Sequence, residues 1–329
     1  MTKVRVGFIG TGRIAKRHME KLTNIKDAEL VCICDISKEE VQKTAKKYKA
    51  KFYIEYREML EKEDLDALYI CIPPFTHNDQ EVIAANKRIN LFIEKPLTLD
   101  INKACQINKV IQEKGIISSV GYVYRYSDIV NKVREEINGK KIAMLLGYYL
   151  CPMRDIYWWR VKGQSGGQIV EQTTHLFDLA RYFIGEVDKV YTQAFQGLME
   201  DVKNYTIDDA SCVTLRFKSS TIGNISSACT LSQGRDWGIN LIGRGFRIDL
   251  LLSSHLLKIT NGGKKEMLMK IDPYQAENEA FIRAIKEGNP KYIRSSYADA
   301  LKTLKLTLAA NISLEEKRVI TLEEELKLI

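Results

Sequence analysis

The feature that most constrains the fold of this chain lies at its start, where a short apolar run ends at two glycines. Val4–Ile9 is rich in β-branched residues, which is typical of a buried parallel strand. Gly10-Thr11-Gly12 ends this run, and Arg13–Leu22 follows with apolar residues near helical spacing. A strand, a glycine turn and a helix in this order predict the opening of an α/β sheet.

The turn matches Gly-x-Gly-x-x-Ala, a pattern that binds dinucleotides when it joins a strand to a helix. Gly10 permits the tight turn, Gly12 lets a pyrophosphate approach the backbone, and Ala15 lets helix and strand pack closely. The helix N-terminus supplies N–H groups and a partial positive charge. We therefore expect Gly10, Gly12, Arg13 and Ile14 to contact a bound dinucleotide, although a plain structural turn is the alternative.

An acidic residue follows the second expected strand. Residues 29–34 form this strand and end at Asp35, near the roughly 20-residue offset expected after a glycine turn. Its carboxylate can accept the ribose hydroxyls of the adenosine and would repel a 2′-phosphate, which favours NAD. Lys38 offsets part of that repulsion, so NADP is not excluded. The structural alternative is a helix cap that Asp35 forms with Ser37.

Strands and helices alternate as far as Val120. Further strands are expected at 67–72, Asn90–Ile93 and 116–120, and helices at Lys38–Tyr48, 76–86 and 99–114. This alternation predicts a parallel sheet with helices on both faces, and right-handed crossovers make it doubly wound. Ligands of such sheets bind at the carboxyl ends of the strands.

Two of these strand ends carry further candidates. Pro73 follows 67–72 and can form an apolar wall beside a cofactor, while His77 is a second cofactor candidate with a structural alternative. Glu94-Lys95-Pro96 follows Asn90–Ile93 and directs a lysine to the same crevice as the glycine turn. There Lys95 can hydrogen-bond a substrate hydroxyl and stabilise negative charge on oxygen. The alternative for Glu94 and Lys95 is a surface ion pair.

The pattern changes after Tyr122. Segments 143–150, Val187–Phe195, Ala210–Phe217, 223–230 and 237–242 are expected as strands with few helices between them, which predicts a mainly antiparallel sheet. Helices are expected at 169–183, 275–287 and Tyr297–Glu316. We predict two domains, residues 1–121 and 122–329, as the length of 329 residues also suggests.

The expected helix at 169–183 contains a third group of polar residues. On a continuous helix, Glu171 and His175 are one turn apart and share a face, with Gln172 beside it. A histidine near a carboxylate is a suitable proton acceptor, because its unperturbed pKa lies near 6.5. A capped helix with a structural histidine is the alternative. Since one His and one Glu do not make a metal site, no metal is expected.

Composition excludes several classes of protein. The net charge of +8 is spread among many acidic residues without a basic block, so no nucleic-acid partner is expected. No apolar stretch approaches the roughly 18 residues of a membrane helix, and the first residues do not resemble a signal peptide. The seven cysteines are scattered without a Cys-x-x-Cys pair, which favours a cytoplasmic location.

Taken together, the motifs resemble those of the Gfo/Idh/MocA family, named after glucose–fructose oxidoreductase, inositol dehydrogenase and a rhizopine-catabolism dehydrogenase. The resemblance runs through nearly the whole chain, and Glu-Lys-Pro after a Rossmann start is its most specific part. The matching motifs, in chain order, are Gly10–Ala15, Asp35, Glu94-Lys95-Pro96, Gly121–Tyr126 and Gly166-Gly167 with His175-Leu176-Phe177-Asp178.

The resemblance implies an α/β Rossmann N-terminal domain and an α+β C-terminal domain with a mostly antiparallel open sheet. It also implies NAD(P)-dependent oxidation or reduction of a ring hydroxyl of a sugar, cyclitol or related compound. Lys95 matches the family's catalytic lysine and His175 its catalytic histidine. Glu171 stands where polyol dehydrogenases often have Asp, which keeps a carboxylate on a longer arm and puts an inositol-like substrate in doubt.

Substrate contacts are expected from residues whose side chains suit a sugar ring. Aromatic faces pack on its C–H surface, and arginines bind carboxylates or several hydroxyls. A core or interface role is the alternative, above all for Trp158. The candidates are Arg125, Tyr157, Trp159, Arg160 and Gln172.

The leading hypothesis is thus an NAD(P)-dependent dehydrogenase in which His175 takes the hydroxyl proton, Lys95 assists and Glu171 tunes His175. One alternative is a glycosidase that uses tightly bound NAD for transient oxidation. Another is a non-catalytic regulator that senses dinucleotide, against which the presence of both Lys95 and His175 argues. We also expect a homodimer or homotetramer formed through the open face of the antiparallel sheet.

Overall fold

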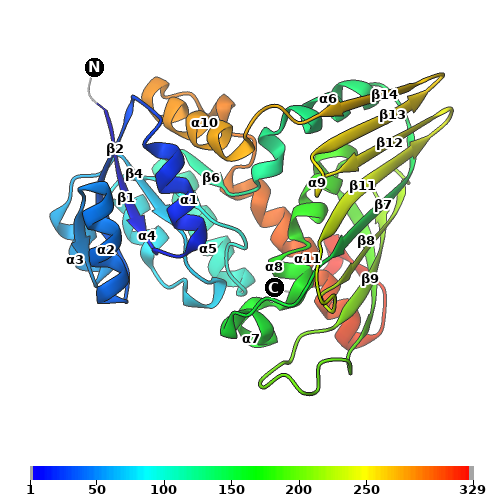
Figure 1. Cartoon of the computed structure of the whole chain (residues 1–329), viewed down its shortest axis with the longest axis horizontal. Helices are drawn as coiled ribbons and strands as arrows, with labels where there is room; N and C mark the ends of the chain where they lie inside the picture. Colours follow the sequence, from blue (N-terminus) through cyan, green and yellow to red (C-terminus); the bar gives the residue numbers. More distant parts are fainter. Residues whose placement is uncertain (1–2, 326–329) are drawn as a thin grey trace. The chain divides into compact units, whose positions relative to one another are not determined.

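The computed structural model describes residues 3–325. The chain forms two compact units. The first contains the chain up to Tyr126 together with Asp272–Leu301, and the second contains Ser127–Ile271 and the chain from Lys302 onward (Figure 1). The boundary expected between residues 121 and 122 lies close to Tyr126. A single boundary does not, however, describe a chain in which Asp272–Leu301 returns to the first unit.

The first unit is built on a six-stranded sheet in which every neighbouring pair is parallel. The strand order is β3-β2-β1-β4-β5-β6, so the direction of winding reverses between β1 and β4, where doubly wound sheets bind ligands. The strands are β1 (Val4–Ile9), β2 (Ala28–Cys34), β3 (Lys51–Tyr53), β4 (Ala67–Ile70), β5 (Asn90–Ile93) and β6 (Ser118–Val120).

Helices and 3₁₀ turns connect these strands. The helix α1 has the bounds expected from the sequence, because Gly12 precedes it and its apolar residues bury one face. The short β3 and α3 were not expected. The elements are α1 (Arg13–Leu22), α2 (Lys38–Tyr48), α3 (Tyr56–Lys62), η1 (Pro74–Thr76), α4 (Gln80–Asn86), α5 (Ile101–Lys114), η2 (Val123–Tyr126), α10 (Pro273–Glu287), η4 (Pro290–Tyr292) and the start of α11 (Tyr297–Glu316).

The core of the first unit explains why the late segment returns to it. Phe281 and Ile282 of α10 are buried in the same apolar cluster as Phe8 and Phe92 of the sheet. Tyr69 stacks between Phe8 and Phe92, and Phe281 meets it edge-on with ring centroids 5.5 Å apart. Burial of this aromatic surface holds α10 against the parallel sheet.

The second unit is built on a nine-stranded sheet with the order β14-β13-β12-β11-β7-β10-β9-β8-β15. Its pairs are antiparallel except for β7 and β10, which run parallel. The expectation of a mostly antiparallel sheet is confirmed. The strands are β7 (Ile142–Leu150), β8 (Val187–Phe195), β9 (Ala210–Phe217), β10 (Ile222–Ala228), β11 (Asp236–Gly243), β12 (Phe246–Leu251), β13 (Leu256–Asn261), β14 (Lys264–Leu268) and β15 (Ile320–Thr321).

The helices of the second unit gather on one face of its sheet (Figure 1). α6, α8 and α9 contact β12, β10 and β7, respectively. Strand β9 accordingly alternates buried residues with the exposed Cys212, Thr214 and Arg216. The helical elements are α6 (Asp128–Ile137), η3 (Tyr157–Arg160), α7 (Lys162–Ser165), α8 (Gly167–Glu171), α9 (Thr174–Ile184), the end of α11 and α12 (Leu322–Glu325).

The single helix expected at 169–183 is wrong, because the chain forms α8 and α9 with a break at Gln172 and Thr173. The N–H groups of both break residues converge on the carbonyl of Gln168, at 3.0 and 2.9 Å. The next turn then restarts from the carbonyl of Thr173, which accepts from Leu176 at 2.8 Å. Glu171 and His175 consequently belong to different helices.

Candidate active site

The two glycines of the first turn meet different requirements. Gly10 has φ of +100°, and a Cβ there would lie 2.3 Å from the carbonyl oxygen of Cys71. Its N–H also donates to the carbonyl of Cys34 at 2.8 Å. A Cβ on Gly12, in contrast, would meet nothing within 4 Å. Packing within the protein therefore requires glycine at position 10, and the space beside Gly12 lies open to a ligand.

The helix that follows the turn presents an N-terminus suited to an anion. Gly12 is the N-cap of α1, contributes no side-chain cap, and is followed by no acidic residue in the first turn. Arg13 is exposed and Ile14 is half-buried against the core. The N–H groups of this turn have no capping side chain to accept them, so they suit phosphate oxygens.

Asp35 is hydrogen-bonded to the glycine turn. Its Oδ2 accepts from the N–H and the hydroxyl of Thr11, each at 2.7 Å, and its Oδ1 accepts from the N–H of Ser37 at 2.9 Å. Ser37 caps α2 with its own hydroxyl. A carboxylate has about four acceptor positions, so Asp35 retains capacity for a further donor. The cap expected of Asp35 and Ser37 is thus compatible with ligand binding.

An open cavity of about 490 Å³ lies beside this turn. Lys16 and Glu40 form an ion pair of 2.7 Å at its wall, and the hydrogen bond from Lys16 lowers the pKa of Glu40. The positive charge of Lys16 is thus compensated by a carboxylate of the protein itself. The lining residues are Thr11, Gly12, Arg13, Lys16, Asp35, Ser37 and Glu40.

The end of β4 places its two candidates differently. Pro73 is half-buried and is the N-cap of η1, where its carbonyl accepts from the N–H and hydroxyl of Thr76. His77 is only 1% exposed, and its Nδ1 contacts a carboxylate oxygen of Glu81. Among the described residues, Nε2 of His77 has no hydrogen-bond partner. This burial favours the structural alternative for His77 over direct cofactor contact.

The end of β5 holds Glu94 and Lys95. Glu94 is buried, and its carboxylate accepts from the N–H of Lys95 at 3.1 Å. The other oxygen of Glu94 contacts Nε2 of His18 at 2.9 Å. Lys95 is half-buried, and its peptide bond to Pro96 is cis. The surface ion pair considered for Glu94 and Lys95 is therefore wrong for Glu94, whose carboxylate faces the interior.

In the second unit, Trp159 and Glu171 form a pair. The indole Nε1 of Trp159 donates to Oε2 of Glu171 at 2.6 Å, and Trp159 is 1% exposed. Glu171 and His175 are both half-buried. Trp159 thus orients the carboxylate rather than presenting its own face, and no sequence pattern links residues from η3 and α8.

The neighbouring candidates differ in exposure. Gln172 is buried, and its amide oxygen accepts from Nη2 and Nε of Arg154 at 2.7 and 2.9 Å. Tyr157 is 55% exposed, and the guanidinium of Arg160 lies 5.8 Å from its ring centroid. Of these residues, Tyr157 and Arg160 retain surface that a ligand can contact, and Arg154 is a polar neighbour that the sequence did not indicate.

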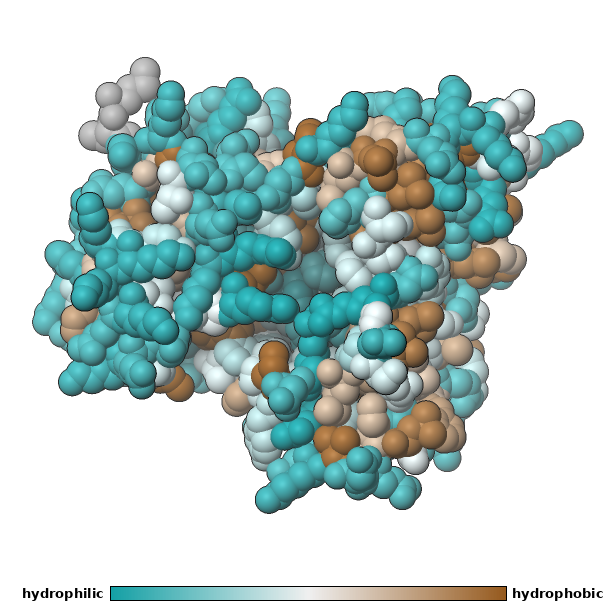
Figure 2. Space-filling model, in the orientation of Figure 1, coloured by the Kyte–Doolittle hydropathy of each residue, from teal (hydrophilic) through white to brown (hydrophobic). Residues whose placement is uncertain are grey.

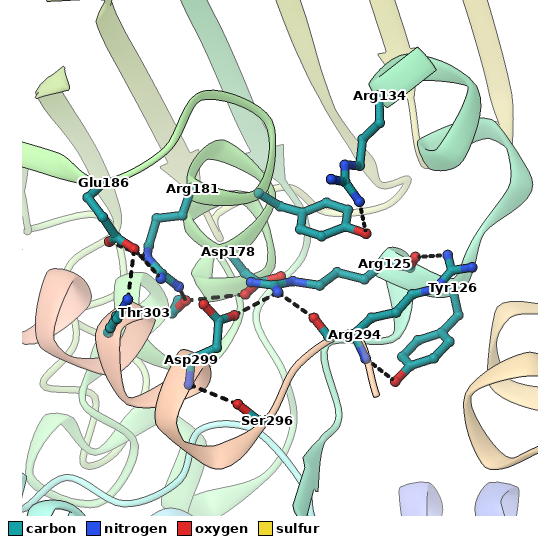
Figure 3. Close-up of polar contacts among 12 residues, drawn as sticks. Arg125, Tyr126, Arg134, Asp178, Arg181, Glu186, Arg294, Ser296, Asp299 and Thr303 are labelled. Carbon is teal, nitrogen blue, oxygen red and sulfur yellow. Dashed lines mark hydrogen bonds and ion pairs between the residues drawn. The ribbon is translucent and has the colours of Figure 1, made fainter. Parts of the chain in front are cut away.

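Arg125 has structural partners in the first unit. Its guanidinium is nearly buried, donates to the carbonyl of Arg294 at 2.6 Å and forms an ion pair with the carboxylate of Asp299 at 2.6 Å (Figure 3). The N–H of Arg294 in turn donates to the hydroxyl of Tyr126 at 2.9 Å. These bonds fasten the segment Asp272–Leu301 to the end of η2. They favour the structural alternative for Arg125 over substrate binding.

Two residues of the first unit were missed by the sequence reasoning. His18 and Asn278 are buried, and they join Glu94 in one hydrogen-bonded group. The histidine lies three residues after Ala15, on the inward face of α1. A polar residue on the apolar face of a helix was the available signal. No comparable signal existed for Asn278, which lies far along the chain.

No group of three or more His, Cys, Asp or Glu residues suited to a metal ion occurs within residues 3–325. In the same range, no helix has both the length and the apolar character needed to cross a membrane.

Two family profiles match the chain. The one described as "Oxidoreductase family, NAD-binding Rossmann fold" matches residues 4–122, and the one described as "GFO/IDH/MocA C-terminal domain" matches residues 141–248. The chain belongs to the GFO/IDH/MocA family of oxidoreductases. The resemblance expected from the motifs is confirmed, and β1–β6 are the family's NAD-binding Rossmann fold.

Relatives within the family match over nearly the full length. The chain is 29% identical to myo-inositol 2-dehydrogenase of Thermotoga maritima, with 98% of this chain and 99% of the relative covered. It is 25% identical to scyllo-inositol 2-dehydrogenase (NAD(+)) of Bacillus subtilis, with 94% of each covered. The crystal structure of a probable dehydrogenase from Thermotoga maritima has a TM-score of 0.83 at 28% identity, and the match covers 98% of this chain and 99% of that one.

Proposed function

We propose that this protein is an NAD-dependent dehydrogenase that interconverts a ring hydroxyl and a ketone of a sugar, cyclitol or related compound. The observation that carries the proposal is the open cavity lined by Gly12 and Asp35 beside the uncapped N-terminus of α1. Membership of an NAD-binding oxidoreductase family and whole-length similarity to two inositol dehydrogenases support it.

The residues of the first unit fit NAD. The open space at Gly12 and the backbone N–H groups of Arg13 and Ile14 suit the pyrophosphate, while Gly10 shapes the turn. Asp35 has room for a ribose hydroxyl beside its three existing donors. When bound, NAD accepts or supplies the hydride at its nicotinamide ring.

Preference for NAD over NADP follows from the charges at this cavity. Asp35 repels a 2′-phosphate, and Lys16 is already paired with Glu40. Lys38 is the cation in the first turn of α2, where it is exposed. Pro73, Glu94 and Lys95 complete the cofactor contacts that we propose at the ends of β4 and β5, and His77 supports them from the interior.

We assign the chemical roles to three residues. Lys95 donates a hydrogen bond to the reacting oxygen and stabilises its negative charge. His175 accepts the hydroxyl proton during oxidation and returns it during reduction. Glu171, fixed through one oxygen by Trp159, orients and tunes His175. Tyr157, Arg160 and the pair Gln172–Arg154 are the proposed substrate contacts, with Trp159 acting through Glu171.

The test is a scan of sugars and cyclitols for NADH absorbance with the wild-type protein and two variants. Lys95→Ala and His175→Ala should each lower turnover by at least about a thousandfold, because both residues act on the reacting oxygen. NAD affinity should stay within about twofold in His175→Ala, since His175 is not among the proposed cofactor contacts. Wild-type turnover in either variant would contradict the assigned role. Release of a free sugar without net NADH would instead indicate transient oxidation, and NAD binding without turnover a sensing role.

We also propose a homodimer or homotetramer formed through the open face of the second sheet. Leu146 and Ile222 are 41% and 47% exposed on this face, and the register brings Met144 beside Ile222 and Leu146 beside Asn224. Figure 2 shows hydrophobic side chains in larger groups on the second unit than on the first. Light scattering that gives a monomer mass would contradict this proposal.

The seven free cysteines support a cytoplasmic location.

A further inference from the structure

A chain of buried hydrogen bonds runs through the first unit and ends at the backbone of Lys95. It begins at the hydroxyl of Tyr69 on β4, which donates to Oδ1 of Asn278 at 2.9 Å. Nδ2 of Asn278 contacts Nδ1 of His18 at 2.9 Å, and Nε2 of His18 contacts Oε1 of Glu94 at 2.9 Å. The last bond joins the other oxygen of Glu94 to the N–H of Lys95.

The partners of Asn278 determine which ring nitrogen of His18 donates a hydrogen bond. The carbonyl of Tyr274 can only accept, and it lies 2.7 Å from Nδ2 of Asn278, so this atom is the amide nitrogen. Its second hydrogen points to Nδ1 of His18, which must therefore be an acceptor. Nε2 is then the ring nitrogen of His18 that donates to Glu94.

The enclosure leaves this arrangement little freedom. The ring of His18 is fully buried, with ring centroids of Phe92 and Tyr274 at 4.8 and 5.8 Å. On its other side, the carboxylate of Glu94 fills the space beside Gly121, where a Cβ would lie 2.7 Å from its oxygen. The carboxylate is thus held between a donor from α1 and a glycine that follows β6.

We propose that His18 is a positioning residue for Lys95. It fixes the Glu94 carboxylate, which in turn holds the backbone N–H of Lys95 and sets where the lysine side chain leaves the end of β5. His18 also lies on the same helix whose N-terminus we assign to the pyrophosphate. It therefore ties the cofactor turn and the catalytic lysine to one rigid frame. This inference rests on the role proposed for Lys95.

Two substitutions of His18 distinguish the effect of its hydrogen bond to Glu94 from the effect of its side-chain volume. His18→Met introduces an apolar side chain of similar length and removes the donor to Glu94. His18→Gln keeps an N–H donor near the position of Nε2, so it should restore most of what Met loses. Gly121→Ala disturbs the same carboxylate from the opposite side without changing His18.

The kinetic measurement is kcat, KM for substrate and the dissociation constant of NAD. We expect His18→Met to lower kcat by about tenfold to a hundredfold, because a small misplacement of a catalytic group costs that much. The NAD dissociation constant should stay within about twofold, and His18→Gln should recover at least half of the loss on a logarithmic scale. Equal losses in Met and Gln, or an unchanged kcat in His18→Met, would overturn the proposal.

A second measurement does not depend on activity. In native-state hydrogen exchange, the peptide that contains Lys95 should exchange at least about tenfold faster in His18→Met and in Gly121→Ala, while peptides from β2 stay unchanged. Unchanged exchange at Lys95 would overturn the positioning role even if no substrate is found. Faster exchange at Lys95 in a protein without dehydrogenase activity would support the positioning role and count against the proposed function instead.

Discussion

The glycine turn of the first unit and the Glu171–His175 segment of the second are held in place by different kinds of interaction. The turn is shaped by backbone geometry, with the positive φ of Gly10 and the uncapped N-terminus of α1. The Glu171 carboxylate is instead held by the side chain of Trp159, from a separate 3₁₀ turn. Backbone requirements leave a mark on the sequence that side-chain contacts between distant segments do not leave.

The largest expected effect concerns Gly10. Gly10→Ala adds strain at a positive φ and a Cβ within 2.3 Å of a carbonyl oxygen, so the first unit should lose about 3 kcal/mol or more of unfolding free energy. Gly12→Ala, whose Cβ meets nothing within 4 Å, should cost less than about 1 kcal/mol while weakening NAD binding. Equal losses in the two variants would show that packing does not distinguish the glycines.

The three tryptophans give this experiment a spectroscopic control. All of them lie in the second unit, as Trp158, Trp159 and Trp237. In urea, Gly10→Ala should lower the midpoint of the far-UV circular dichroism transition more than that of tryptophan fluorescence. Identical shifts in both signals would mean that the two units unfold together and that the glycine turn does not stabilise the first unit separately.

The next largest effect is expected from the pair in the second unit. Trp159→Phe removes the donor to Glu171 and some buried volume, so it should cost about 2 kcal/mol and lower kcat. Glu171→Gln keeps an oxygen that accepts from Trp159, and should lower kcat at a stability cost below about 1 kcal/mol. Chemical denaturation and steady-state kinetics of both variants test this difference. A Glu171→Gln variant as unstable as Trp159→Phe would contradict it.

A smaller effect is expected at Asp35. Asp35→Asn replaces one acceptor oxygen by an amide group, which then faces the N–H of Ser37 or the donors of Thr11. The cost should be about 1 kcal/mol, and the ratio of NADP to NAD affinity should rise because the negative charge is lost. Titration with both cofactors measures this ratio. Thr11→Val, which removes one donor and no charge, should leave the ratio unchanged.

The smallest effect is a pH dependence in the second unit. Glu186 accepts from Nε and Nη2 of Arg181 at 3.0 and 2.9 Å (Figure 3), and these bonds hold its pKa below the ordinary value. Because the pKa is lower in the folded state, this stabilisation is present above the unfolded pKa near 4.3 and is lost as the pH falls through the folded value. Its size is a fraction of a kcal/mol, since Glu186 is partly exposed.

Glu186→Gln should therefore narrow the difference between the melting temperatures measured at neutral pH and well below pH 4. An unchanged difference would show that Glu186 does not contribute to acid destabilisation. Arg181 keeps its bond to the hydroxyl of Thr303 in either case, which limits the structural disturbance.

Much of the first unit was predictable because its determinants are local. The strands β1 and β5 and the helices α1 and α2 have the bounds expected from apolar periodicity, and Asp35 and Lys95 lie at the predicted strand ends. The short β3 and α3 escaped prediction because a few residues carry too little periodicity. The role of Glu94 also escaped, since its partner His18 is distant in the sequence.

The second unit shows where local patterns mislead. The apolar spacing of 169–183 is continuous across Gln172, yet α8 ends at Glu171 and α9 begins at Thr174, and the Gln172 amide oxygen accepts from Arg154. Tertiary context overrides helical propensity, and contacts between distant side chains leave no local pattern in the sequence. The same holds for Arg125, Arg294 and Asp299, which the sequence assigned to residues 122–329, whereas the structure places all three in the first unit.

The return of Asp272–Leu301 to the first unit has a consequence for biosynthesis. A ribosome releases the sheet β1–β6 early, but Phe281 and Asn278 reach it only after all of β7–β14 have been made. Until then Tyr69 and His18 lack their partner, and aromatic surface on the sheet stays uncovered. The cofactor-binding half of the protein is begun first and completed nearly last, so a nascent chain spends most of its synthesis in need of protection from aggregation.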